Sequence, residues 1–407
     1  MKKFGLLGEK LSHSFSPLIH GMLADYSYTL IERKPEELEE LFAKGEYDGF
    51  NVTIPYKKAV IPYMTELSDV AKRCDSINTV VRRADGTYYG DNTDYYGFRM
   101  TVEQSGVAVS GKKVLVLGDG GVASTVRVVL ADLGADPIVT ISRRGENNYT
   151  NLDLHEDAEV IVNTTPVGMY PECGKSPVNL DVFPKLCGVF DLIFNPLQTE
   201  ILLSAKERNI PAFGGLLMLV KQAICASEKF IDCTYDDEKT AEIERHIRVM
   251  QSDIFLIGMP GCGKSSVGRK LAELTGRELL DTDQLITEKH GRAPGDIIVE
   301  DGESAFRKIE TEALREVASM SGKIIATGGG IVTIPENLRL MQQNGIIIFI
   351  DRSIDKLSKK GRPLSGNVEK LAEIRMPLYK SWCQYTVSGD TVEEKALKIK
   401  EIIERAE

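Results

Sequence analysis

One eight-residue segment constrains the C-terminal third of this 407-residue chain more than any other feature. Residues 258–265, GMPGCGKS, fit the phosphate-loop pattern GxxxxGK[ST]. An apolar run from Ile254, typical of a buried strand, precedes the segment, and an amphipathic stretch typical of a helix follows it. In that setting the glycines let backbone N–H groups surround phosphate oxygens, Lys264 reaches the outer phosphates and Ser265 can hold magnesium. The segment therefore predicts a P-loop nucleotide-binding domain.

Further polar residues follow the loop in a fixed order. A second strand is expected to end in LLDTD, which would place Asp281 and Asp283 on the same face of an extended segment. One carboxylate could then hold Mg²⁺ while the other faces a substrate hydroxyl, and the alternative is a helix cap. The motifs downstream are GExxFR with Arg307, the glycine run 328–330, RPL with Arg362, and RxPLY with Arg375.

The whole chain alternates short apolar runs with amphipathic stretches, a pattern that predicts an α/β fold of parallel sheets covered by helices. Its length argues for more than one domain. The expected strands are 4–7, 29–32, 49–53, 79–82, 138–142, 160–163 and 189–193, with helices at 35–44 and 392–406. The predicted domain boundaries are 1–105, completed by a helix near 215–235, then 106–235, a charged linker or solvated helix at 236–251, and 252–407.

A second glycine-rich turn follows the strand-like run VLVLG. Residues 118–121 read GDGG, and Ala123 stands where the dinucleotide-binding pattern allows Gly or Ala. The next strand ends in ISRR, so Arg143 and Arg144 lie where a 2′-phosphate would be recognised, which favours NADP over NAD. A plain strand–helix turn and a solvated strand end are the alternatives.

Two sets of ordered motifs resemble known families. Residues 1–235 contain SHSFSP, NVTIPYK, SINTV, GDNTD and GGLLMLVKQ, and this segment resembles shikimate dehydrogenase. Residues 252–407 contain the phosphate loop, LDTD, GExxFR, GGG, RPL and RxPLY, and this segment resembles shikimate kinase. The resemblance implies a substrate-binding α/β domain, a Rossmann-like NADP domain, and a P-loop kinase domain with a parallel sheet.

The dehydrogenase resemblance implies a catalytic pair formed by Lys57 and Asp94. A lysine beside an aspartate can move a proton to or from the oxygen at the carbon that receives hydride. Shikimate would be held by Ser14, Ser16, Thr53, Asn78 and Gln222. Cofactor contacts would fall on Asp69, Gly118, Gly120, Gly121, Val122, Ala123, Ser142, Arg143 and Gly215.

The kinase resemblance implies that Asp283 and Lys264 are catalytic, with Asp283 accepting the proton of the attacking hydroxyl. Shikimate would contact Arg307, Gly329 and Arg375. The two arginines could bind its carboxylate. ATP would contact Gly258, Gly261, Cys262, Gly263, Ser266 and Arg362. Mg²⁺ would be held by Ser265 and Asp281.

Three features depart from the patterns of these families. Phe194 stands where a tyrosine is expected, so one hydroxyl for the substrate carboxylate is missing. Only 21 positions separate Ser142 from Asn163, which leaves little room for a helix. Only 13 positions separate Arg362 from Arg375, which predicts a short lid.

Composition restricts the partners. A formal net charge of -10 argues against a nucleic-acid ligand, and no stretch approaches the roughly twenty apolar residues of a membrane span. Seven cysteines without a CxxC pair or metal-ligand spacing indicate reduced thiols and a cytoplasmic location.

The sequence thus predicts an enzyme with two consecutive activities of aromatic amino-acid biosynthesis. The first is reduction of 3-dehydroshikimate by NADPH, and the second is phosphorylation of shikimate to shikimate 3-phosphate by ATP with Mg²⁺. In one alternative only the kinase is active and the dehydrogenase-like half senses a ligand or is structural. In another the dehydrogenase prefers quinate. Nothing in the sequence indicates an oligomeric state.

Overall fold

The computed structural model describes residues 2–11, 14–357 and 368–406. It divides into two compact units. The first comprises Met1–Gly168, Lys175–Phe194 and Ser204–Glu244, and the second comprises Met169–Gly174, Asn195–Leu203 and Arg245–Glu407. Within the second unit, the short segment Met169–Gly174 is held by the Tyr170 hydroxyl, which donates to the carbonyl of Ala318 at 2.6 Å.

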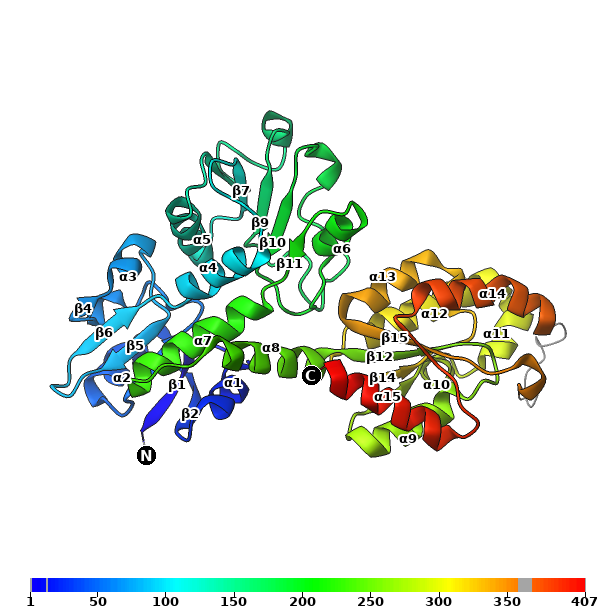
Figure 1. The fold of residues 1–407 in the computed structure, drawn as a ribbon. Coiled ribbons are helices and arrows are strands. Elements are labelled where there is room, and N and C mark those ends of the chain that lie inside the picture. The colour runs from blue at the N-terminus through cyan, green and yellow to red at the C-terminus, as the bar shows by residue number, and fades with distance from the viewer. Residues whose placement is uncertain (1, 12–13, 358–367, 407) are drawn as a thin grey trace. The chain divides into compact units, whose positions relative to one another are not determined.

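The first unit contains two sheets (Figure 1). The N-terminal sheet has the order β2-β1-β3-β5-β6-β4, in which β1 pairs in parallel with β2 and β3, while β5 is antiparallel to both its neighbours. Its elements are β1 (Lys3–Gly8), α1 (Ser16–Leu23), β2 (Ser27–Glu32), η1 (Pro35–Glu37), α2 (Leu38–Lys44), β3 (Gly49–Val52), η2 (Ile61–Tyr63), β4 (Glu66–Leu67), α3 (Asp69–Cys74), β5 (Thr79–Arg82) and β6 (Tyr88–Asp91).

The second sheet is wholly parallel, in the order β11-β10-β9-β7-β8. Its elements are α4 (Asp94–Ser105), β7 (Val114–Leu117), α5 (Gly121–Asp132), β8 (Ile138–Ile141), η3 (Leu152–His155), β9 (Val160–Asn163), η4 (Leu180–Val182), β10 (Gly188–Asp191), α6 (Glu200–Glu207), β11 (Ala212–Phe213) and α7 (Leu216–Ile231). Between β8 and β9 the chain forms only the short 3-10 helix η3, as the spacing of this segment predicted.

Helix α7 connects the two sheets of the first unit. It lies beside α4 in Figure 1 and packs against it. At its end Phe230 stacks on Phe4 of β1, with ring centroids 4.4 Å apart. The helix thereby brings polar residues of its own next to those of the N-terminal sheet.

The second unit is built on a third, wholly parallel sheet of order β13-β14-β12-β15-β16. The helix α8 (Asp237–Gln251) begins in the first unit and continues into the second from Arg245. The other elements of the second unit are β12 (Asp253–Ile257), α9 (Lys264–Thr275), β13 (Leu279–Asp281), α10 (Thr282–His290), α11 (Pro294–Asp301), α12 (Glu303–Ala318), β14 (Ile324–Ala326), η5 (Ile331–Thr333), α13 (Pro335–Asn344), β15 (Gly345–Ile350), η6 (Ile354–Lys356), α14 (Val368–Trp382), β16 (Tyr385–Val387) and α15 (Val392–Ala406). The charged segment before β12 is thus the helix α8, one of the two forms that the sequence left open.

The α/β class predicted from the sequence is confirmed by the three sheets. Apolar runs became buried strands because each is covered on both faces: β7 and β12, for example, are buried at every position. Among the described residues, none of the helices combines the length and apolar character needed to cross a membrane.

Two candidate active sites

The first unit contains a cavity of about 670 Å³ at the end of β3 and β5. Seven of its lining residues are those predicted to bind or convert substrate. They are Ser14, Ser16, Thr53, Lys57, Asn78, Asp94 and Gln222. They come from five separate parts of the chain, and the fold of the first unit brings them together.

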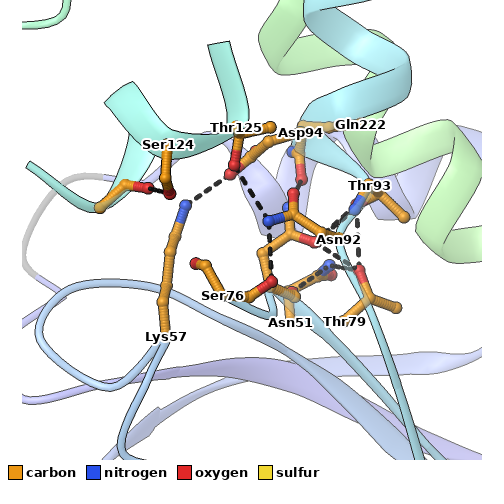
Figure 2. Close-up of polar contacts among 12 residues, drawn as sticks. Asn51, Lys57, Ser76, Thr79, Asn92, Thr93, Asp94, Ser124, Thr125 and Gln222 are labelled. Carbon is orange, nitrogen blue, oxygen red and sulfur yellow. Dashed lines mark hydrogen bonds and ion pairs between the residues drawn. The ribbon is translucent and has the colours of Figure 1, made fainter. Parts of the chain in front are cut away.

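Lys57 and Asp94 form a direct ion pair in this cavity (Figure 2). The Lys57 Nζ lies 2.6 Å from the Asp94 Oδ2, and the two side chains are 19% and 10% exposed. Asp94 opens α4, so its carboxylate lies at the positive end of a helix dipole. A lysine and a carboxylate in direct contact, both mostly buried, can exchange a proton with a bound ligand.

The Asn78 side chain is fixed by residues that the sequence analysis missed. Its Oδ1 accepts hydrogen bonds from the backbone N–H and the hydroxyl of Thr93, at 2.6 and 3.0 Å, and from the hydroxyl of Thr79 at 3.1 Å. Its Nδ2 donates to the Oε1 of Gln222, 3.4 Å away. Thr79 and Thr93 lie within SINTV and GDNTD, and that proximity to the motifs was the only sequence signal for them.

The glycine-rich turn after β7 has room for a phosphate. Gly118 has a φ of +102°, and a Cβ at this position would lie 2.8 Å from the Thr164 Oγ1. A Cβ on Gly120 or Gly121 would meet no atom within 4 Å, so the space before α5 is open. Backbone N–H groups at a helix N-terminus facing open space fit a pyrophosphate.

The predicted cofactor residues are spread over several places. Val122 and Gly215 line the cavity itself. Ser142 and Arg143 follow β8, and the Ser142 N–H donates to the Asn147 carbonyl at 3.1 Å. Asp69 does not line the cavity: its side chain is 93% exposed and pairs with Lys72.

Phe194 lines the same cavity, where the sequence departs from the expected tyrosine. Its ring meets that of Phe15 edge to face, with centroids 6.1 Å apart. This wall is therefore apolar.

The second unit contains a cavity of about 610 Å³. Its lining includes six predicted residues, namely Ser265, Asp281, Asp283, Arg307, Gly329 and Arg375. Arg375 is buried on α14, and Arg307 is largely buried on α12. Two guanidinium groups in one cavity can bind a carboxylate.

Glu310 is a buried residue of this cavity that the sequence analysis missed. Its Oε2 accepts a hydrogen bond from Arg307 at 2.7 Å, and burial raises the pKa of its carboxyl group. The outer side of Arg307 is bound by Glu303, also at 2.7 Å. The only sequence signal for Glu310 was its position three residues after Arg307 on a helix, a spacing at which side chains contact each other.

The glycine run packs closely on these charged groups. A Cβ on Gly328 would lie 2.3 Å from the Glu310 Oε1 and 3.0 Å from the Asp283 Oδ1. A Cβ on Gly330 would lie 2.1 Å from the Arg307 Nη1. The hydroxyl of Tyr379 donates to the Gly329 carbonyl, which holds the run in place. A side chain at Gly328 or Gly330 would therefore displace these charged groups from their present positions.

The predicted arrangement of Asp281 and Asp283 on one extended face is wrong. Strand β13 ends at Asp281 and α10 begins at the next residue, because Asp281 caps that helix. Its Oδ1 accepts from the Asp283 N–H at 3.0 Å, and its Oδ2 accepts from the Ser265 hydroxyl at 2.5 Å. The pairing still groups a hydroxyl and a carboxylate beside the phosphate loop, which is a donor set that suits Mg²⁺.

The phosphate loop has the conformation its glycines predict. Gly258, Gly261 and Gly263 have positive φ angles, and a Cβ on Gly263 would meet nothing within 4 Å. Lys264 is buried, and its Nζ donates to the Gly258 carbonyl at 2.8 Å. The open N-terminus of α9 fits a nucleotide phosphate. Of the remaining predicted nucleotide contacts, Cys262 is buried in the loop, Ser266 lies in the first turn of α9, and Arg362 lies outside the described residues.

Comparisons with known proteins divide the chain in the same way. A family model described as shikimate dehydrogenase substrate binding domain matches residues 6–80. A family model described as shikimate kinase matches residues 260–407.

Curated relatives match the first unit. The shikimate dehydrogenase (NADP(+)) of Clostridium beijerinckii is 37% identical over 259 residues, which cover 59% of this chain and 96% of that protein. The enzyme of the same description from Clostridium perfringens strain 13 is 36% identical over 270 residues, covering 61% and 99%.

Solved structures of shikimate dehydrogenases are also similar to this chain. A chorismate mutase/shikimate 5-dehydrogenase fusion protein from Clostridium acetobutylicum has a TM-score of 0.58 at 35% identity, covering 60% of this chain and 96% of that one. Shikimate 5-dehydrogenase from Thermus thermophilus, solved with NADP(H) and shikimate, has a TM-score of 0.54 at 28% identity, covering 60% and 99%.

Proposed function

Because the chain belongs to the shikimate dehydrogenase family and carries a shikimate kinase domain behind that part, we propose that it catalyses two consecutive reactions. The first reduces 3-dehydroshikimate to shikimate with NADPH, and the second phosphorylates shikimate to shikimate 3-phosphate with ATP and Mg²⁺. The observation that carries the proposal is that each unit gathers predicted site residues in one cavity: Lys57 and Asp94 in the first unit, and Asp283 with two arginines in the second. The limits 1–105, 106–235 and 252–407 are our proposed boundaries for the substrate-binding, NADP-binding and kinase domains.

In the dehydrogenase site, NADPH when bound supplies the hydride. Lys57 donates a proton to the oxygen of the carbonyl that is reduced, and Asp94 holds the lysine and a substrate hydroxyl in place. Asn78 and Gln222 hold the other hydroxyls, and Ser14 and Ser16 bind the carboxylate.

In the kinase site, Arg307 and Arg375 bind the shikimate carboxylate, which orients the ring. Asp283 accepts the proton of the attacking hydroxyl. Lys264 and the N–H groups of the phosphate loop bind the outer phosphates, and Ser265 with Asp281 holds Mg²⁺, which neutralises charge on the phosphates when bound.

A ligand-sensing role for the first unit would not require a lysine hydrogen-bonded to a carboxylate inside the cavity, so the Lys57–Asp94 pair favours an enzyme. A preference for quinate is tested by offering both acids as substrates for NADP⁺ reduction.

The test is a pair of assays on the full chain and four variants. Lys57→Ala should abolish NADPH-dependent reduction and leave shikimate-dependent ATP consumption, and Lys264→Ala should do the reverse. Lys58→Ala and Lys270→Ala are the matched controls, since both lysines are surface residues that form ion pairs outside the cavities. Absence of both reactions in the wild-type chain would refute the proposal. Loss of both activities in each catalytic variant would show that the units do not act separately.

A further inference from the structure

One cationic side chain of the second unit has no role in the proposed mechanism. Lys395 lies in the first turn of α15, the helix that packs against the phosphate-loop helix α9 (Figure 1). Only 4% of its surface is exposed, which is unusual for a lysine. Its long stem is therefore enclosed, and its helix begins shortly after β16, at the carboxyl edge of the sheet.

Lys395 lies near the phosphate loop and near the residues that follow strand β15. It lies within electrostatic range of Cys262 in the phosphate loop, and of Asp351 and Arg352, which directly follow β15. Ligands of open parallel sheets bind at this carboxyl edge of the strands. Burial, and then the charge of Arg352, lower the pKa of Lys395.

The ammonium group of Lys395 has no hydrogen-bond or ion-pair partner in the part of the chain that the structure describes. Other lysines of the same helix are paired. Lys398 donates to the Ser388 carbonyl at 2.9 Å and to Glu394 at 2.7 Å, and Lys400 pairs with Glu404 at 3.3 Å. The residue as a whole is nearly buried, and its ammonium group has no protein partner among these residues, so the group is free to bind a ligand. Its position is explained if an anionic ligand supplies the partner.

We propose that Lys395 is a nucleotide-binding residue of the kinase site, whose ammonium group binds a phosphate of ATP together with the phosphate loop. This inference rests on the proposed kinase function. The alternative is that the lysine stem only covers apolar surface while its tip reaches water. The two differ in what removal of the charge does to nucleotide affinity.

The test is calorimetric titration of the full chain with MgADP. We expect Lys395→Met to weaken binding about tenfold relative to wild type, which corresponds to about 1.4 kcal/mol. Lys400→Met, a surface lysine on the same helix, should bind within about twofold of wild type. If the wild-type chain binds no MgADP, the proposed kinase function fails. If the wild type binds and Lys395→Met binds equally well, the inference alone fails.

A thermal-unfolding measurement separates binding from packing. Without ligand, Lys395→Met should melt at a higher temperature than wild type, because it replaces an unpaired cation on a largely enclosed side chain with an apolar group. With saturating MgADP its melting temperature should rise less than that of wild type. A lower melting temperature with an undiminished MgADP shift would make the residue structural and overturn the proposal.

If Lys395→Met does not fold, Lys395→Arg and Lys395→Gln provide the same comparison. The arginine keeps the charge and should bind MgADP within about threefold of wild type, whereas the glutamine should lose about tenfold. Equal affinities of these two variants would also overturn the proposal.

Discussion

Glu310 shows how a single buried carboxylate sets up the kinase cavity. The buried Glu310 forms an ion pair with Arg307, and the exposed Glu303 forms a second one. The Oε1 of Glu310 has no hydrogen-bond partner among the described residues, and burial raises the pKa of the group. The position of Arg307 therefore depends on the Glu310 carboxylate, whose charged form is destabilised by burial. Such an arrangement is common where a residue serves binding rather than stability.

We expect Glu310→Gln to raise the KM for shikimate about tenfold, since Arg307 loses the charge that orients it. The KM for ATP and the dehydrogenase activity should not change. Glu303→Gln is the matched control: that carboxylate is exposed, so its loss should change the KM for shikimate by about threefold or less. Steady-state kinetics of both activities provide the measurement, and an equal effect of the two substitutions would contradict the role given to Glu310.

Phe194 is the corresponding single-residue departure in the dehydrogenase cavity. Phe194→Tyr would add a hydroxyl to a wall that is otherwise apolar. One new hydrogen bond to the substrate carboxylate contributes about 1 kcal/mol, so the KM for shikimate should fall about fivefold. Phe15→Tyr, on the ring facing it, serves as a control for added polarity. A KM that rises or stays constant in Phe194→Tyr would show that the apolar wall is adapted to this substrate.

At the scale of elements, strand β12 begins with a buried carboxyl group. Asp253 accepts a hydrogen bond from the Lys323 N–H at 2.8 Å, while its Oδ2 has no hydrogen-bond partner among the described residues. Burial raises the pKa of Asp253 to about 8. Since the folded state binds this proton more tightly than the unfolded state, stability is complete at acid pH and is lost as the pH rises towards 8.

Asp253→Asn removes that dependence. Between pH 5 and pH 8 the wild-type second unit should lose up to about 1.4 kcal/mol of unfolding free energy per pH unit relative to the variant. Urea unfolding at several pH values is the measurement. Asp296→Asn, a substitution at the start of α11, controls for the removal of one negative charge. If the unfolding free energies of wild type and Asp253→Asn changed with pH in the same way, Asp253 would not be the source of the pH dependence.

The elements also show what the sequence could predict. Apolar runs located strands such as β7 and β9, because a strand buried on both faces consists almost entirely of such residues. Strands such as β6 and β16 were not predicted. The extended face expected for Asp281 and Asp283 was wrong, because Asp281 forms the helix cap that the sequence left open as the alternative. The hydrogen bonds that decide between the two forms are not visible in the residue pattern. The Thr79 and Thr93 contacts to Asn78, and the burial of Glu310, arise only when separate elements pack together. Motifs thus predicted which residues meet, and packing determined how they are held.

At the scale of the whole molecule, each unit has its own apolar core. One cluster of buried residues surrounds β12 and β15 in the second unit, with Phe255 and Phe349 among its members. In the first unit one cluster surrounds β7 and α5, and another surrounds β3. Cooperative unfolding follows the buried core, so units with separate cores can melt separately.

Calorimetry of the full chain should therefore show two transitions that respond to different ligands. A ligand at one hundred times its Kd stabilises the state that binds it by about 2.7 kcal/mol, which for units of this size raises the melting temperature by roughly 5 to 10 °C. NADPH should move only the transition of the first unit and MgADP only that of the second. Lys264→Ala, which weakens the phosphate loop, should abolish the MgADP shift and leave the NADPH shift intact, and so assign the two transitions. A single transition raised by either ligand would mean that the two cores unfold together, because stabilisation of one unit would then be transmitted to the other.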